Sequence, residues 1–144
     1  MIQINGSLAS KLNKLLKKDN DNLMFSEDEL SSIVKISLSK SELAYLDYLK
    51  NVQTLELDAF PSITNDDLEE VSNILTKLKS LKIKEQNALF VLDLSVFTNL
   101  EELCLIHNDN LVDIIGLNKV KRFTFYDNKD FEDIEQIVDF LLNN

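Results

Sequence analysis

Residues 108–128 read NDNLVDIIGLNKVKRFTFYDN, and apolar side chains recur in this stretch at every third position until the spacing shortens to two. Its second half, from Leu117 to Phe125, runs apolar, two others, apolar, two others, apolar, one other, apolar. The same pattern occurs four more times upstream, and the five copies are Leu30/Ile33/Ile36/Leu38, Leu49/Val52/Leu55/Leu57, Leu75/Leu78/Leu81/Ile83, Phe97/Leu100/Leu103/Leu105 and Leu117/Val120/Phe123/Phe125. The steps between the last apolar residues of successive copies are 19, 26, 22 and 20 residues. A period in the twenties predicts a stacked architecture of short units.

Each copy predicts one short strand. The last apolar residues of a copy are two apart, so they point to one side of a strand and into a shared interior. About five such strands side by side form a parallel sheet, which places the chain in the α/β class. Between the second and third strands, residues 65–77 have apolar side chains at helical spacing, with Thr64 or Asn65 as the cap. The last return, residues 108–117, steps by three and predicts a 3₁₀ or extended segment.

Helices are expected at both ends of the array. Ser7 stands where an N-cap should be, ahead of Leu8, Leu12, Leu15 and Leu16, which lie on one face of a helix. At the other end, apolar residues between 131 and 142 make an amphipathic helix. We therefore expect a single domain with an N-terminal helical cap at 1–29, five repeats at 30–128 and a C-terminal helical cap at 129–144. Stacked units need such covers for their end surfaces.

The composition favours an ordered cytoplasmic protein. The 144 residues include two glycines and one proline, and 44% of them are hydrophobic. No stretch approaches the ~20 apolar residues of a membrane helix, and the N-terminus does not resemble a secretory signal. The single cysteine, Cys104, excludes an internal disulfide and fits a reducing compartment.

The net charge of −10 restricts the class of partner. Such a charge repels nucleic acid and attracts cationic proteins. An acidic surface can equally serve solubility alone. The composition leaves both interpretations open.

Residues 30–128 resemble leucine-rich repeats, and the stretch from Asn108 to Asn128 resembles the short 22-residue class of bacterial internalin-type proteins. The resemblance implies a curved α/β solenoid that binds other proteins, commonly on its concave sheet, without catalysis. The family's asparagine after each strand is matched by Asn108 and Asn128. Ser41, Phe60 and Gln86 stand at the other three positions, so we expect an incomplete buried asparagine ladder and irregular turns there.

Residues between the inward-facing ones should line the concave face. Its charged side chains are four basic (Lys35, Lys82, Lys84, Arg122) and three acidic (Glu56, Asp58, Glu102), so the face is expected to be near neutral. The candidate partner-binding residues are Glu56, Asp58, Lys82, Lys84, Glu102, Cys104, Ile106, Arg122 and Tyr126. Ile106, Tyr126 and Cys104, with Arg122 beside them, form an apolar cluster of the kind found at interface hot spots. The alternative is that the C-terminal segment covers this cluster.

The residues offer little for catalysis. Cys104 and His107 are three apart, and side chains three apart on a strand point to opposite faces, so a thiol–base pair is not expected. One histidine and one cysteine cannot supply a zinc site, and there is no glycine-rich phosphate loop. We expect no enzyme activity, no cofactor and no metal.

The sequence thus favours a protein-binding module without enzyme activity. The leading hypothesis is a small bacterial inhibitor, or immunity protein, that neutralises a cognate toxin of basic character. The alternative is an adaptor or effector module that recognises a host or signalling protein. Neither hypothesis involves nucleic acid or a membrane, and a monomer is favoured.

Overall fold

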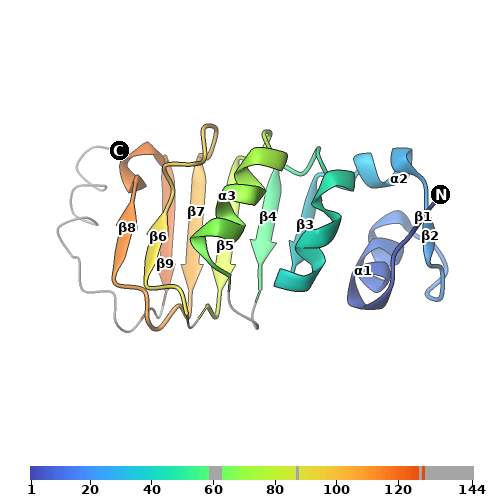
Figure 1. Ribbon diagram of the computed structural model, residues 1–144, viewed down its shortest axis with the longest axis horizontal. Helices are drawn as coiled ribbons and strands as arrows, with labels where there is room; N and C mark the ends of the chain where they lie inside the picture. Colours follow the sequence, from blue (N-terminus) through green and yellow to red (C-terminus); the bar gives the residue numbers. More distant parts are fainter. Residues whose placement is uncertain (59–62, 87, 127, 129–144) are drawn as a thin grey trace.

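Five parallel strands form the centre of the fold (Figure 1). The computed structural model describes residues 1–58, 63–86, 88–126 and 128. Its elements are β1 (Ile2–Gln3), α1 (Gly6–Leu16), β2 (Met24–Phe25), α2 (Glu27–Ser31), β3 (Lys35–Leu38), η1 (Lys40–Tyr48), β4 (Thr54–Leu57), α3 (Asn65–Ile74), β5 (Ser80–Lys84), β6 (Val91–Asp93), β7 (Glu102–Ile106), β8 (Asp113–Ile115), η2 (Leu117–Lys119) and β9 (Arg122–Tyr126). The five-stranded sheet has the order β3-β4-β5-β7-β9, so the chain has an α/β fold.

The five strands pair in the register that the sequence predicts. The last apolar residues of successive copies are paired across the sheet, as Leu38 with Leu57, Leu57 with Ile83, Ile83 with Leu105, and Leu105 with Phe125. The apolar residues of the first four copies are buried, and so are Leu117 and Val120 of the fifth. Phe123 and Phe125 are only partly buried, since β9 is an edge strand of the described sheet.

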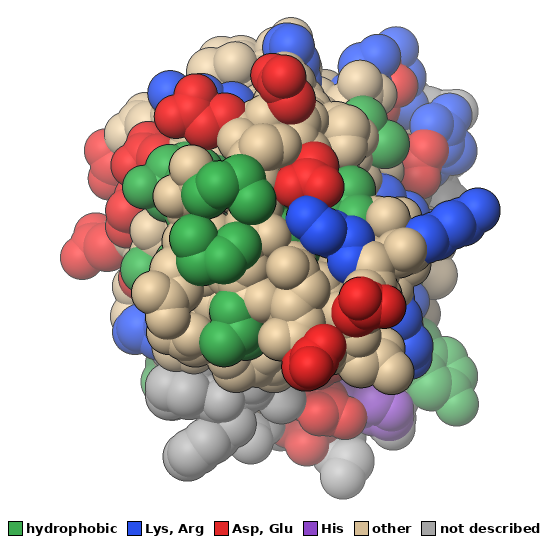
Figure 2. Space-filling view, turned by 90° about the vertical axis from the view of Figure 1, so that its right-hand side faces the viewer, with side chains coloured by type: hydrophobic (Ala, Val, Ile, Leu, Met, Phe, Trp, Pro, Cys, Tyr) green, Lys and Arg blue, Asp and Glu red, His purple; other side chains and the backbone are tan. Residues whose placement is uncertain are grey.

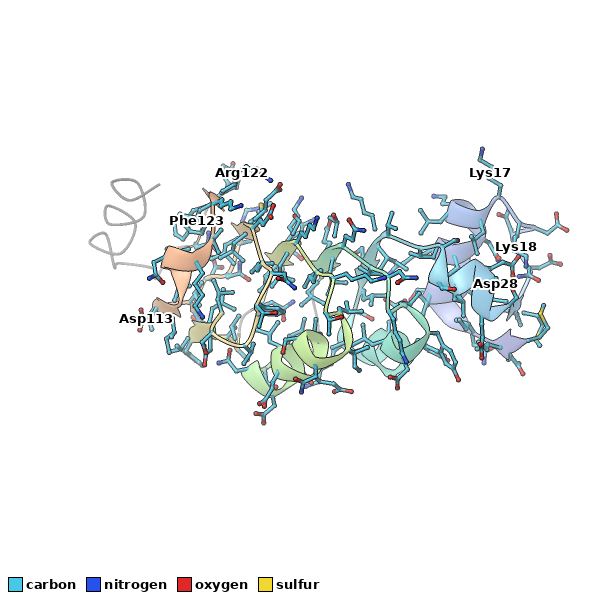
Figure 3. The ribbon with its side chains drawn as sticks, turned by 90° about the horizontal axis from the view of Figure 1, so that it is seen from above. Lys17, Lys18, Asp28, Asp113, Arg122 and Phe123 are labelled. Atoms are coloured by element: carbon cyan, nitrogen blue, oxygen red, sulfur yellow. The ribbon has the colours of Figure 1, made fainter. Side chains whose placement is uncertain are left out.

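One face of the sheet is covered by the return segments. Figure 3 shows η1 and α3 together on one side of the strands. The paired strands β6 and β8 replace helices in the later returns. The extended β8 agrees with the spacing by three in residues 108–117, whereas no strand was predicted at β6. Leu43, Leu68, Leu92 and Ile114 from these segments are buried in the core. Helix α3 has the predicted cap, because Thr64 Oγ1 accepts a hydrogen bond from the backbone N–H of Asp67, but it ends at Ile74, before residue 77.

The N-terminal helix differs from the prediction in two ways. Helix α1 begins at Gly6 with Asn5 as its N-cap, and the Ser7 hydroxyl donates to Glu42 Oε2 at 2.8 Å. Ser7 therefore donates to a buried carboxylate of η1 and does not cap its own helix. Leu8 and Leu12 are buried as expected, whereas Leu15 is 50% exposed. A capping box formed by Ser26 and Glu29 begins α2.

The polar ladder under the strand ends is longer than predicted. Gln86, Asn108 and Asn128 are all buried. Asn108 Oδ1 accepts from the backbone N–H of Gln86 at 3.1 Å, and Asn128 Oδ1 accepts from that of Asn108 at 2.8 Å. The Gln86 side chain continues the series, since its Oε1 accepts from the N–H of Ile63 at 2.7 Å. The longer glutamine thus takes the place of asparagine in this turn and extends the ladder one position beyond Asn108.

Of the other two ladder positions and the predicted C-terminal helix, only Ser41 lies within the described residues. Ser41 lies in η1 and is exposed, so it takes no part in the ladder. Phe60 and the expected helix between 131 and 142 lie outside the described residues. Among the helices of the described ranges, none combines the length and the apolar character needed to span a bilayer.

Candidate functional site

Among the described residues, the return segments place no helix or strand over the second face of the sheet (Figure 3). We call it the uncovered face. Its side chains form three rows across the paired strands: Lys35, Thr54, Ser80, Glu102 and Arg122; then Ser37, Glu56, Lys82, Cys104 and Thr124; then Lys84, Ile106 and Tyr126, with Asp58 after the end of β4. All of them are half-buried or exposed. The nine candidate residues therefore lie on one surface.

Two ion pairs compensate charges on this face. Lys84 Nζ lies 3.2 Å from Glu56 Oε1, and Arg122 Nε donates to Glu102 Oε1 at 2.9 Å. The hydrogen bond to Glu56 raises the pKa of Lys84. Ion pairs that remain accessible to solvent contribute little to stability. Each charge in these two pairs is nevertheless compensated by its partner. Arg122 lies in the first row with Glu102, two rows away from Tyr126.

The N-terminal part of the uncovered face is hollowed, because α1 stands beside β3 at this end of the sheet (Figure 1). The hollow has a volume of about 620 Å³. It is lined by Lys11, Lys14 and Leu15 of α1 and by Lys35, Ile36, Ser37, Thr54, Leu55, Glu56, Ser80, Lys82 and Cys104 of four strands. We call it the α1–sheet hollow. Only Glu56, Lys82 and Cys104 among its residues were candidates from the sequence.

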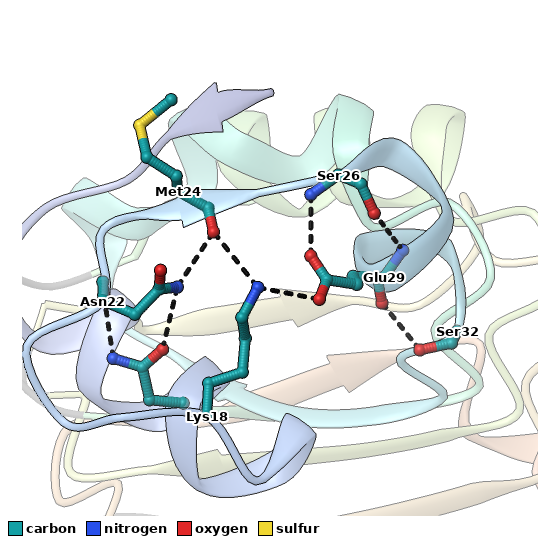
Figure 4. Close-up of polar contacts among 7 residues, drawn as sticks. Lys18, Asn22, Met24, Ser26, Glu29 and Ser32 are labelled. Atoms are coloured by element: carbon teal, nitrogen blue, oxygen red, sulfur yellow. Dashed lines mark hydrogen bonds and ion pairs between the residues drawn. The ribbon is translucent and has the colours of Figure 1, made fainter.

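Two networks hold α1 in this position. Lys11 Nζ donates to Glu42 Oε1 at 2.6 Å and to the carbonyl of Ser37 at 2.9 Å. Figure 4 shows the second network, in which Lys18 Nζ donates to Glu29 Oε1 at 2.7 Å and to the carbonyl of Met24. The hydrogen bond from Lys18 is the largest influence on Glu29 and lowers the pKa of that carboxyl. The helix is thereby tied to both β3 and α2.

The charge of the hollow is not neutral. Lys11 is compensated by Glu42, and Glu56 is compensated by Lys84. The remaining three lysines, Lys14, Lys35 and Lys82, make no ion pair with another residue of the described ranges. The prediction of a near-neutral face counted Lys35 and Lys82 but not Lys14, because α1 lies outside the repeats, and it did not show that these lysines gather at one end of the face.

Cys104 and His107 do not have the geometry assumed from the sequence. Strand β7 ends at Ile106, and His107 has a left-handed backbone with φ 55°, so strand alternation does not determine its direction. Its ring packs edge-on against Tyr126, with the ring centroids 5.7 Å apart. Burial raises the pKa of the Cys104 thiol, and the opposing effect of Lys82 is smaller. The thiol lacks the lowered pKa of an activated nucleophile.

We expect alkylation of Cys104 by iodoacetamide at pH 7 to be several-fold slower in the folded chain than in the chain unfolded in urea, because less thiolate is present. The rate should keep rising with pH beyond the range in which the unfolded thiol titrates. A folded-state thiol that titrates below the unfolded one would contradict this result. Turnover of a general hydrolase substrate by the wild-type chain that is lost in Cys104→Ala would contradict the inference that this thiol is not an activated nucleophile.

A second exposed feature lies at the N-terminal end of the molecule, where hydrophobic side chains gather among charged ones (Figure 2). The exposed apolar residues of this end include Met1, Leu23 and Met24, at 77%, 41% and 39%. Met1 precedes β1, Leu23 precedes β2 and Met24 lies in β2, which pairs antiparallel with β1. This patch is separate from the uncovered face.

Within the described ranges, no group of three or more histidine, cysteine, aspartate or glutamate side chains is placed to hold a metal ion. The uncovered face has a hollow with a mostly apolar lining and with lysines that make no ion pair with a described residue at one end, and it has the Ile106–Tyr126 pair at the other end. Such a surface is suited to contact with another macromolecule.

No protein-family model matches the chain, and a search of the curated proteins also finds no match.

Proposed function

We propose that this chain is a leucine-rich-repeat protein without enzyme activity, and that it binds another protein through the uncovered face. In this proposal it acts as a small bacterial inhibitor of the immunity type, which neutralises a cognate toxin by occupying part of its surface. It does so in the cytoplasm.

The observation that carries the proposal is the contrast between the two faces of the sheet. One face is packed under η1, α3 and the β6–β8 pair, whereas the other presents half-buried and exposed side chains in three in-register rows. At its C-terminal end Tyr126 is 62% exposed beside Ile106. Exposed aromatic side chains set among polar neighbours are frequent anchors of protein interfaces.

The net charge supports a partner of opposite overall sign. The chain carries −10, and acidic residues of α3 such as Asp66, Asp67, Glu69 and Glu70 lie on the covered side, away from the uncovered face. Charges outside a contact chiefly accelerate diffusional encounter. We therefore propose a partner with positive net charge, whose association rate falls as salt is added.

The test is co-purification from the native source with mass spectrometry, followed by binding kinetics with the recovered protein. We expect a stoichiometric partner that is retained by Lys79→Glu and lost by Lys82→Glu combined with Tyr126→Ala. Lys79 is the matched control, because it is exposed and immediately precedes β5 but does not line the hollow. Absence of a stoichiometric partner, or equal retention by both variants, would remove the proposed function.

A further inference from the structure

We propose that the α1–sheet hollow is the anchor site for an acidic segment of the partner protein, with a large apolar side chain on the floor and carboxylates against the lysines. This inference rests on the proposed function and deepens it. It identifies the part of the uncovered face that recognises the partner and the chemistry of the segment that fits.

The lining of the hollow is mostly apolar surface. Its floor is the strands themselves, with the small side chains of Ser37, Thr54 and Ser80 and the half-buried thiol of Cys104 between the lysines, while the side chains of Ile36 and Leu55 are buried on the opposite face of the sheet. Leu15 of α1 forms part of the wall and is 50% exposed, although the helical pattern groups it with the buried leucines. A volume of about 620 Å³ is within the range of sites that enclose a compact ligand, so one or two large side chains fit.

The rim of the hollow is basic. Lys14, Lys35 and Lys82 come from α1, β3 and β5, so three separate elements each contribute a lysine to the lining. The nearby carboxylates, Glu42 and Glu56, already pair with Lys11 and Lys84. A local positive surplus thus exists in a protein of net charge −10. Carboxylates of a bound segment would compensate it with charge-assisted hydrogen bonds.

Charge complementarity distinguishes between the possible occupants of the α1–sheet hollow, which are a basic segment, a nucleic acid and an acidic segment. A basic segment would place its cations against three unpaired lysines and is disfavoured. A nucleic acid would be repelled by the net charge of the whole molecule, whereas a short acidic segment within a basic protein would not. The net charge of the chain therefore affects the rate at which it meets the partner, whereas the hollow selects the segment of the partner that stays bound.

Three fluorescent peptides test the proposal on the full chain: DEFEDFDE, its basic counterpart KKFKKFKK, and DEAEDADE, which lacks the aromatic rings. Cys104 is the chain's only cysteine and lines the hollow, so its rate of alkylation reports occupancy directly. We expect the first peptide to bind at least about tenfold more tightly than the other two and to slow alkylation about tenfold at saturation.

Variants locate the site. Lys35→Glu combined with Lys82→Glu, and separately Leu15→Glu, should each weaken binding of DEFEDFDE about tenfold or more, whereas Lys79→Glu should stay within about twofold. Because Lys82 influences the Cys104 thiol, alkylation is compared with and without peptide in each variant. Circular dichroism checks that every variant is folded.

The other outcomes overturn the inference. They are binding of KKFKKFKK as tight as that of DEFEDFDE, binding that leaves alkylation of Cys104 unchanged, or no binding of any peptide up to about 1 mM. Protection of Cys104 that rises with protein concentration alone would assign the hollow to a second copy of the chain. In each of these cases the proposed function survives if the co-purified partner is lost by Lys82→Glu with Tyr126→Ala but retained by Lys79→Glu.

Discussion

Replacing Asn108 by leucine lowers the free energy of unfolding by about 3 to 5 kcal/mol, which is the largest effect we expect from a single substitution. Asn108 is fully buried, and its side chain accepts from the N–H of Gln86 and donates to the carbonyl of Ile83 at 3.0 Å. Leucine has a similar size but cannot replace either bond. Each buried backbone group left without a partner costs about 1 to 3 kcal/mol.

Urea denaturation followed by circular dichroism measures this loss as a lower midpoint at an unchanged slope. The matched control is Asn99→Leu, since Asn99 also donates to a backbone carbonyl, that of Thr76 at 3.0 Å, but is exposed. We expect the control to cost less than about 1 kcal/mol. If Asn108→Leu costs no more than the control, the ladder does not stabilise the strand ends.

Replacing Lys11 by methionine lowers the free energy of unfolding by about 2 to 3 kcal/mol at pH 7, and the loss disappears in acid. Glu42 is 5% exposed and receives hydrogen bonds from Lys11, Ser7 and the backbone N–H of Ser39. Removing one partner of a buried pair leaves a charge without compensation, which costs about 3 to 5 kcal/mol in full burial. We expect less here, because about a third of the Lys11 side chain is exposed.

The pH dependence follows from the pKa of Glu42. Burial raises this pKa, but the hydrogen bonds from Lys11, Ser39 and Ser7 together outweigh burial, so the pKa is lowered. A lowered folded-state pKa means that the pair stabilises the fold above the unfolded-state pKa and that this contribution is lost as the pH falls through the folded-state pKa. The gap between wild type and Lys11→Met should therefore narrow below about pH 4.5.

Unfolding in urea from pH 3 to pH 8 measures this gap. Lys14→Met is the control, because Lys14 lies one turn further along α1, is exposed and makes no ion pair with a described residue. It should change stability by less than about 0.5 kcal/mol. A gap that stays constant down to pH 3, or equal losses for the two lysines, would show that the carboxylate of Glu42 does not depend on Lys11.

The basic half of the uncovered face could not be predicted from the repeats. Lys35 and Lys82 were placed correctly by strand alternation, and the nine candidate residues do share one surface. Lys14 and Leu15 were missed, because α1 lies before the first repeat and periodicity says nothing about where a flanking helix stands. Its helical pattern instead predicted that Leu15 is buried.

The sequence pattern also could not predict how far the polar ladder extends. Gln86 was judged a mismatch by residue type, yet its longer side chain reaches the N–H of Ile63 while its backbone N–H is satisfied by Asn108. Residue type alone does not reveal such a substitution, since the distance to be bridged depends on the turn. Glu85 and His107 in the same turns have left-handed backbones, with φ of 56° and 55°. Neither residue is a glycine, so the sequence does not indicate this conformation.

The sequence by itself determined the sheet. Apolar residues two apart select one side of a strand, and a slip by one residue would expose that whole set, so the recurring motif is sufficient to predict five parallel strands in register. Only the tertiary structure decided where α1 stands and hence that a hollow exists. That position depends on the hydrogen bonds from Lys11 and Ser7 to Glu42, which join residues 31 and 35 positions apart in the sequence. No local periodicity encodes contacts at such separations.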